Sequence, residues 1–146
     1  MDTSNTPATT PEFDVASYEI ADTATLTVRN ARLDDILIGA DRENPVTIEL
    51  YSPGSPQGIR ALHKASRSAQ LRTYRALRGE TSQNDADDAE RDNVAKLTAF
   101  TKAINNFPVP GGPEKVYANA KLGYITKQVE EFIGKYASFS KGPSGS

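Results

Sequence analysis

The 146-residue chain has no cysteine, no tryptophan and a single histidine, His63. Without cysteine it forms no disulfide, carries no thiolate nucleophile and builds no zinc site of the cysteine type, and one histidine is too few for a multi-histidine metal site. No apolar run approaches the roughly 20 residues that span a bilayer, and the first residues lack the charged start and apolar stretch of a secretory signal. We therefore expect a cytosolic protein with no metal, no cofactor and no membrane contact.

The formal net charge is only −2 because segments of opposite sign cancel one another. Six Lys or Arg side chains and no acidic ones lie between Arg60 and Arg78, and six acidic side chains follow between Glu80 and Asp92. Such sorting indicates either two helices held in register by opposite charges or a charged surface for a partner. The slightly acidic balance of the whole chain argues against a dedicated nucleic-acid-binding protein, whose domains are usually basic.

Segments in the first third of the chain alternate apolar and polar residues. Residues 24–28 and 46–51 both follow this period of two, which is typical of strands with one buried face. A short apolar run at 36–38, bounded by Asp and Gly, predicts a third strand, and residues 13–20 are a candidate edge strand. We expect a small antiparallel meander, which needs a cover of helices to be stable.

A long helix is predicted after the turn that ends at Ser55. Ser55 is a good N-cap, Pro56 suits the first helical position, and Gly79 ends the helix just after Arg78. On a helical wheel the basic side chains fall opposite a stripe of apolar and small residues, which we expect to be buried. This stripe consists of Ile59, Leu62, Ser66, Ala69, Thr73, Ala76 and Leu77.

The second half of the chain predicts further helices. An acidic first turn, capped by Asn84 or Asp85, predicts a helix that ends near residues 105–106. A loop rich in Pro and Gly follows at 108–113. Beyond it, apolar residues at helical spacing predict a short helical turn and then a last helix over about residues 122–138.

The composition of the two ends sets the domain limits. Residues 1–12 and 140–146 have few large side chains, so we expect both to be disordered. Residues 13–139 then form a single domain, with the meander in 13–52 and the helices in 55–139. The predicted fold class is α+β, a small antiparallel β-meander at the N-terminus packed against three to four C-terminal helices.

The segments that could carry chemistry each lack part of the required pattern. The acidic run at 85–90 has Ala and Glu where an EF-hand loop requires an oxygen ligand and glycine. Gly111 and Gly112 precede a helix start, where backbone N–H groups bind anions, but no complete phosphate-loop motif is present. His63 has cations around it and no acidic residue nearby in sequence to orient it as a base. We therefore predict no catalytic residue and no enzyme activity.

The basic side of the first long helix has two interpretations. It is either a solvated face, partly neutralised by the acidic start of the next helix, or a surface that contacts phosphates or an acidic protein. The loop rich in Pro and Gly is a second candidate surface. The candidate partner-binding residues are Arg60, Lys64, Arg67, Arg75 and Arg78 on the helix and Pro110, Gly111 and Gly112 in the loop.

The predicted elements follow one another in a distinctive order. A polar N-terminal segment precedes a meander that ends in residues 46–51, a helix that opens at Ser55-Pro56 and an acidic second helix. The chain closes with Val116-Tyr117-Ala118-Asn119, Leu122-Gly123-Tyr124-Ile125 and Gln128-Val129-Glu130-Glu131-Phe132. Over residues 24–139 this layout resembles the tail assembly chaperone-like proteins of long-tailed (siphovirus-type) bacteriophages.

The resemblance implies a non-enzymatic assembly factor that works in the cytoplasm of the bacterial host. Such a factor binds the tape-measure and tail tube proteins during tail morphogenesis and is absent from the finished virion. It can also associate with itself as a homo-oligomer. Two alternatives stay open. One is a structural tail or neck protein that remains in the virion, and the other is a nucleic-acid or regulatory binding module that uses the basic helix 59–78.

Overall fold

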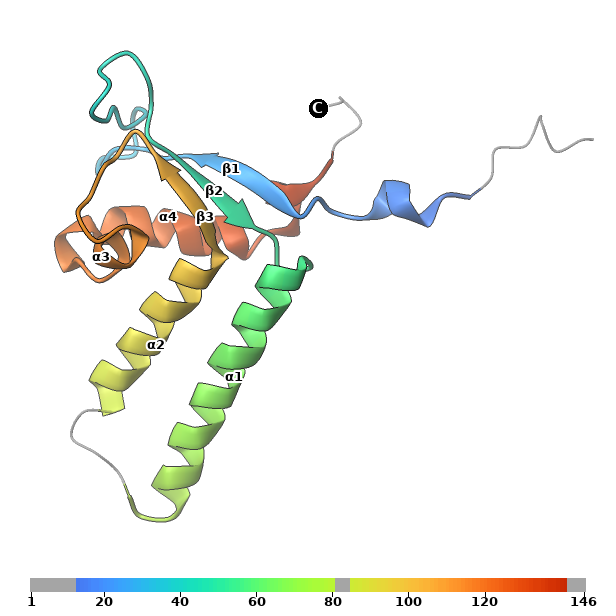
Figure 1. Cartoon of the computed structure of the whole chain (residues 1–146), viewed down its shortest axis with the longest axis vertical. Helices are drawn as coiled ribbons and strands as arrows, with labels where there is room; N and C mark the ends of the chain where they lie inside the picture. The colour runs from blue at the N-terminus through green and yellow to red at the C-terminus, as the bar shows by residue number, and fades with distance from the viewer. Residues whose placement is uncertain (1–12, 81–84, 142–146) are drawn as a thin grey trace, which may run out of the picture.

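The computed structural model describes residues 13–80 and 85–141, and its fold class is α+β, as predicted (Figure 1). The expectations for residues 1–12, for Asn84 and for the end of the chain after Lys141 concern positions outside the described residues. The described strands and helices are β1 (Thr23–Thr27), β2 (Thr47–Tyr51), α1 (Pro56–Leu77), α2 (Asp85–Phe100), β3 (Thr101–Asn105), α3 (Pro113–Tyr117) and α4 (Gly123–Ile133), with short 3-10 turns η3 (Val15–Tyr18), η4 (Ala120–Leu122) and η5 (Tyr136–Phe139).

The three strands form one antiparallel sheet in the order β1-β2-β3. Ile48 in the central strand pairs with Leu26 on one side and with Ile104 on the other. The third strand is therefore not the predicted one, because the sequence pattern places residues 101–105 at the end of a helix. Thr101 and Ile104 are β-branched, and they pair with an edge of β2 that a helix would leave open.

The segments predicted as the third and edge strands have other structures. Residues 36–38 make only isolated bridges outside the sheet, and residues 13–20 contain the turn η3. Leu37 is held by backbone bonds, because its N–H donates to the Val28 carbonyl at 2.8 Å and its carbonyl accepts from the Val46 N–H at 2.7 Å. Asn106, which follows β3 with a positive φ of 65°, holds the next turn. Its side-chain amide donates to the carbonyl oxygens of Asp41 at 3.0 Å and Asn44 at 2.7 Å. Single bridges and a turn thus replace the predicted strand at 36–38.

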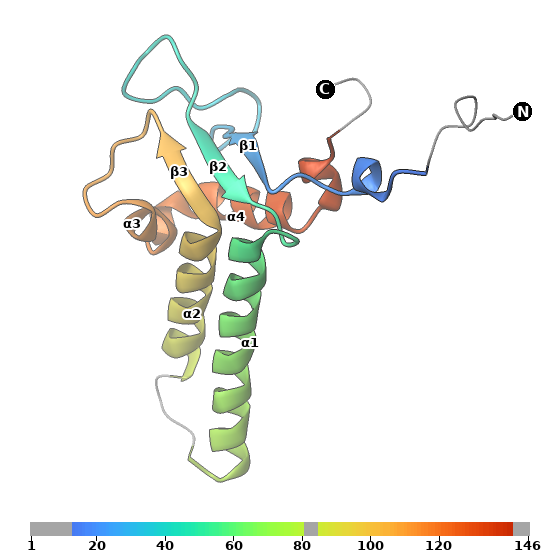
Figure 2. The same ribbon diagram turned by 45° about the vertical axis from the view of Figure 1, so that its right-hand side comes forward.

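The helices α1 and α2 are inserted between β2 and β3 and form a hairpin that projects from the sheet (Figures 1 and 2). Ser55 caps α1 as predicted, because its hydroxyl accepts a hydrogen bond from the Gly58 N–H at 3.0 Å. A Cβ at Gly58 would lie 2.0 Å from the carbonyl oxygen of Ser52. Glycine thus lets α1 start close to the end of β2, and Gly79, with a φ of 75°, ends α1 where expected.

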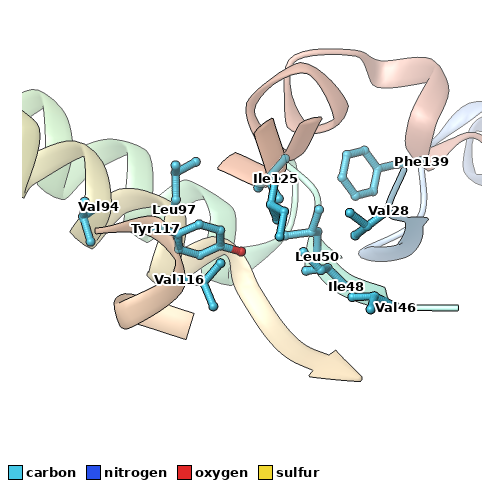
Figure 3. Packing of buried hydrophobic residues seen from close by; sticks show 11 residues of the cluster. Val28, Val46, Ile48, Leu50, Val94, Leu97, Val116, Tyr117, Ile125 and Phe139 are labelled. Atoms are coloured by element: carbon cyan, nitrogen blue, oxygen red, sulfur yellow. The ribbon is translucent and has the colours of Figure 1, made fainter. Parts of the chain in front are cut away.

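The core lies between the sheet and α4, with α3 and α2 contributing at one end (Figure 3). Fully buried Ile48 and Leu50 of β2 belong to the same cluster as Ile125 and Val129 of α4. Burial of each such side chain stabilises the fold by about 1.5–3 kcal/mol relative to exposure. The buried cluster consists of Val28, Val46, Ile48, Leu50, Val94, Leu97, Val116, Tyr117, Ile125, Val129 and Phe139.

The last helix is shorter than the predicted 122–138. α4 ends at Ile133 because Gly134, a poor helix former, occupies its C-cap. The turn η5 then brings Phe139 back to the core, where it is 1% exposed and lies edge-on to Phe132 with ring centroids 5.3 Å apart. The residues after Gly134 therefore pack against the core rather than extending α4. The sheet, α3, α4, η5 and the core between them are called the body below.

Candidate partner-binding surface

The side of α1 that faces α2 is made of small residues. Ala61 is buried, Ala65 and Ser68 are half-buried, and they meet Ala95 and Ala99 of α2 around a narrow hollow of about 60 Å³. Small side chains let two helix backbones approach closely, but they bury little apolar area. The hairpin is consequently close-packed without large side chains between its helices.

One ion pair joins the two helices of the hairpin. The Arg72 guanidinium of α1 contacts the Asp92 carboxylate of α2, and their side chains are 26% and 34% exposed. This contact matches the interpretation in which sorted charges hold two helices in register. It uses Arg72 alone, which is not among the candidate partner-binding residues.

The apolar face of α1, defined as Ile59, Leu62, Ser66, Ala69, Thr73 and Leu77, is exposed, which corrects the prediction of a buried stripe. Leu62 is 42% exposed and Leu77 is 82% exposed. Successive residues turn by about 100° on a helix, which places this face roughly a third of a turn from the side that Ala61 presents to α2. Ala76 of the predicted stripe is exposed as well. The described chain thus leaves an apolar helix surface uncovered.

The basic face of α1, defined as Arg60, Lys64, Arg67, Arg75 and Arg78, is also exposed. Arg78 pairs with Glu80 at 3.2 Å and lies over the Tyr74 ring at 5.3 Å from its centroid. The other four side chains of this face form no ion pair with any described residue. Their charge therefore faces solvent, and the acidic start of α2 does not neutralise it through contacts among the described residues.

A cavity of about 400 Å³, here called the basal cavity, opens where the hairpin joins the body. The sequence does not predict this cavity, because its walls come from segments that are far apart in the chain. Only the apolar spacing of the predicted last helix, which reaches Tyr136, indicates one of its walls. The basal cavity is lined by Pro53, Leu62, Lys96, Leu97, Phe100, Glu130, Ile133, Gly134 and Tyr136.

The loop with Pro110, Gly111 and Gly112 lies beside α3, on the side of α2 away from α1 (Figures 1 and 2). The φ angles of Gly111 and Gly112 are 91° and 77°, values that favour glycine, and the Gly112 N–H donates to the Val109 carbonyl at 2.9 Å. The structure therefore gathers the five cations on one helix face but does not bring the loop residues to them.

The titratable groups with shifted pKa values lie in the body, away from the hairpin. Burial raises the pKa of the Tyr117 hydroxyl, and a hydrogen bond with the Thr101 hydroxyl at 2.6 Å opposes this. Hydrogen bonds from the Glu43 N–H at 3.0 Å and then from the Asn44 side chain at 2.5 Å lower the pKa of Asp41. Both shifts are explained by local structure.

The described residues offer neither a metal site nor a membrane-spanning helix. Residues 13–80 and 85–141 contain no group of three or more His, Cys, Asp or Glu side chains placed to hold a metal ion. Within the same ranges, no helix combines the length and the apolar character needed to cross a membrane.

Comparisons with known proteins add no relative. No family model matches the chain, and neither a curated protein nor a solved structure matches it.

Proposed function

We propose that this protein is a non-enzymatic assembly chaperone that binds tape-measure and tail tube proteins during phage tail morphogenesis, in the cytoplasm of the bacterial host. The observation that supports this proposal is the uncovered apolar face of α1, placed on a projecting hairpin whose opposite side carries the basic face. Proteins bind amphipathic helices by receiving the apolar face of the helix in a hydrophobic groove.

The outer half of the hairpin has a shape suited to such binding. A hollow of about 340 Å³ lies between Ala69, Thr73, Tyr74 and Leu77 and is open to solvent. Covering exposed apolar surface stabilises a complex by roughly 25 cal/mol for each Å² removed from water. An amphipathic helix of a partner can place apolar side chains in this hollow, and Arg78, whose guanidinium lies over the Tyr74 ring, offers a cation beside its wall.

Co-purification tests the proposal. The chain is co-expressed with tape-measure and tail tube proteins of a long-tailed phage, and the complex is captured through a tag on this chain. We expect Ala69→Gln with Leu77→Gln to reduce the captured partner at least about tenfold, equivalent to about 1.4 kcal/mol. Leu71→Gln is the matched control, because Leu71 is 54% exposed but lies outside the apolar face. Equal capture by wild type and both variants, or no capture at all, contradicts the proposal.

The structural alternative predicts a different fate for the protein. A tail or neck subunit stays in the particle, whereas an assembly chaperone leaves before the particle is complete. Mass spectrometry of purified virions separates the two, and stoichiometric copies of this chain in the virion would exclude the chaperone role.

The unpaired cations of the basic face support the nucleic-acid alternative as a second candidate. Phosphate contacts make binding strongly dependent on salt. A gel shift with duplex DNA at low salt that is lost on Arg67→Glu with Arg75→Glu would favour this alternative, and no shift at low salt would remove it.

A further inference from the structure

The N-terminal arm, residues 13–20, exposes two aromatic rings to solvent. It runs away from the body at the start of the described chain (Figures 1 and 2). Phe13 is 76% exposed and Tyr18 is 74% exposed, and their rings stack with centroids 5.3 Å apart. Val15 between them is also exposed. A short segment that presents three large apolar side chains to water has the composition of a docking element.

The arm has a defined shape and direction. Asp14 caps η3, because its carboxylate accepts from the Ala16 N–H at 3.1 Å. At the base of the arm, the Ala21 N–H donates to the Phe139 carbonyl at 2.8 Å, and the Lys141 ammonium lies 3.4 Å from the Ala16 carbonyl. These contacts tie the arm to the end of the chain, and both rings remain exposed to solvent.

The basal cavity has the size and surface that these rings require. Leu62, Phe100, Ile133 and Tyr136 give it apolar walls, and its volume is about 400 Å³. An apolar cavity of roughly 150 Å³ is large enough to take up one benzene molecule. Two aromatic rings therefore fit within the basal cavity of one copy.

The arm is acidic and can pair with a cation of the cavity. The first 28 residues of the chain hold five acidic side chains and no basic one, and Asp14 and Glu19 are exposed within the arm. Lys96 and Glu130 both line the cavity, so its lining carries one charge of each sign. Glu130 already accepts a hydrogen bond from Asn93 at 3.0 Å, whereas Lys96 forms no ion pair with a described residue. Lys96 is therefore the group that can pair with Asp14 or Glu19 of a docked arm and orient it.

We propose that the N-terminal arm of one copy docks into the basal cavity of a second copy, with Phe13 and Tyr18 in the cavity. The contact is head-to-tail, because each copy offers its arm to one neighbour and its cavity to another. Such contacts build closed rings or open chains of subunits according to the rotation between neighbours. The outer half of the apolar face of α1 stays free in this assembly, so the inference does not depend on the proposed function.

Sedimentation velocity with complementary variants tests this arrangement. Phe13→Ser with Tyr18→Ser removes the arm contacts, and Leu62→Asp places an acidic group in the cavity wall. We expect wild type to form oligomers at increasing concentration and each variant to be a monomer alone. An equimolar mixture of the two variants should form a one-to-one dimer and nothing larger, because the mixture retains one intact cavity on the arm variant and one intact arm on the cavity variant.

The controls separate docking from folding and from other modes of association. Leu71→Asp changes an exposed leucine of α1 outside the cavity and should assemble like wild type. Circular dichroism and thermal midpoints must match wild type for each variant, and Tyr136→Asp replaces Leu62→Asp if the latter is unstable. A monomeric wild type, or a mixture of variants that fails to dimerise, overturns the proposal. Dimers formed by either variant alone also overturn it, because they would show a two-fold contact elsewhere.

Discussion

The body and the hairpin of this protein are built on different principles. In the body, large side chains such as Leu50, Ile125 and Phe139 are almost fully removed from water between the sheet and α4. In the hairpin, small residues such as Ala61 line the contact between two helices, and Leu77 at its outer end is 82% exposed. The body therefore buries the large apolar side chains of the fold, while the hairpin leaves apolar side chains exposed to solvent.

This difference has a thermodynamic meaning. Segments with few buried apolar contacts open locally at lower free energy than the core does. The outer part of α1 meets that description, whereas its base is fixed by the cap at Ser55 and by the close approach at Gly58. A binding element that is fixed at one end and adaptable at the other can adjust to a helical partner without disturbing the body.

The sharpest test of the contrast compares two apolar-to-alanine changes. Ile125→Ala removes a side chain that is 1% exposed and leaves a cavity in the body, so we expect the free energy of unfolding to fall by about 2–5 kcal/mol. Leu77→Ala at the hairpin tip should change it by less than about 0.5 kcal/mol. Urea denaturation of both variants measures these values. Similar losses would contradict the expectation that the body contributes far more to stability than the hairpin tip.

The next largest effect concerns the joint between the two regions. Gly58→Ala places a Cβ 2.0 Å from the Ser52 carbonyl oxygen, so α1 must shift, and we expect a loss of about 1–3 kcal/mol by urea denaturation. Gly123→Ala is the matched control, because a Cβ there meets nothing within 4 Å. That variant should be neutral or more stable by up to about 1 kcal/mol. A Gly58→Ala protein as stable as wild type would mean that the base of the hairpin is not fixed.

Within the hairpin, the ion pair between Arg72 and Asp92 is expected to contribute less. Both side chains are partly exposed, and we expect a coupling free energy of about 0.5–1 kcal/mol from a double-mutant cycle with Arg72→Gln and Asp92→Asn. The pair formed by Arg91 and Asp88 at 2.8 Å, within one helix, is the control, with an expected coupling of about 0.2–0.5 kcal/mol. Equal coupling in both cycles would argue against a role for charge in the helix register.

The smallest effect is a pH dependence confined to the body. Because burial raises the pKa of Tyr117 in the folded state, its contribution to stability is complete below the unfolded pKa of about 10 and is lost as the pH rises through the folded value. We expect unfolding midpoints of wild type to fall more steeply above this pH than those of Tyr117→Phe. A fluorescence-detected urea series from neutral to alkaline pH measures the difference, and parallel curves would contradict it.

Local signals in the sequence predict part of this architecture. Ser55 and Pro56 locate the start of α1, Gly79 locates its end, and the alternation at 46–51 predicts β2. Each of these signals acts within a few residues, through a cap, a backbone angle or a side-chain period. Such signals depend little on the rest of the fold.

The features that were missed depend on contacts between distant segments. Thr101 and Ile104 continue the helical spacing of Val94 and Leu97, so the sequence pattern predicts a helix where β3 lies. These residues form a strand because they pair with the open edge of β2. Periodicity also identifies the apolar face of α1 without saying what covers it. The small residues around Ala61 are less hydrophobic than Leu62 and Leu77, yet they are the ones that meet α2, because the hairpin requires close approach rather than buried area.

The insertion of a helical hairpin between β2 and β3 also affects how the chain folds. Pairing Leu50 with Thr101 requires closure of the whole segment between them, and closing a long flexible loop carries an entropic cost. An antiparallel pair of helices returns the chain to its starting point, so its formation delivers Thr101 beside the end of β2. Because local helix contacts form faster than distant strand pairs, we expect the hairpin to be present in the folding transition state before the sheet is complete. The hairpin, which carries the proposed binding surface, would then also form before the sheet during folding.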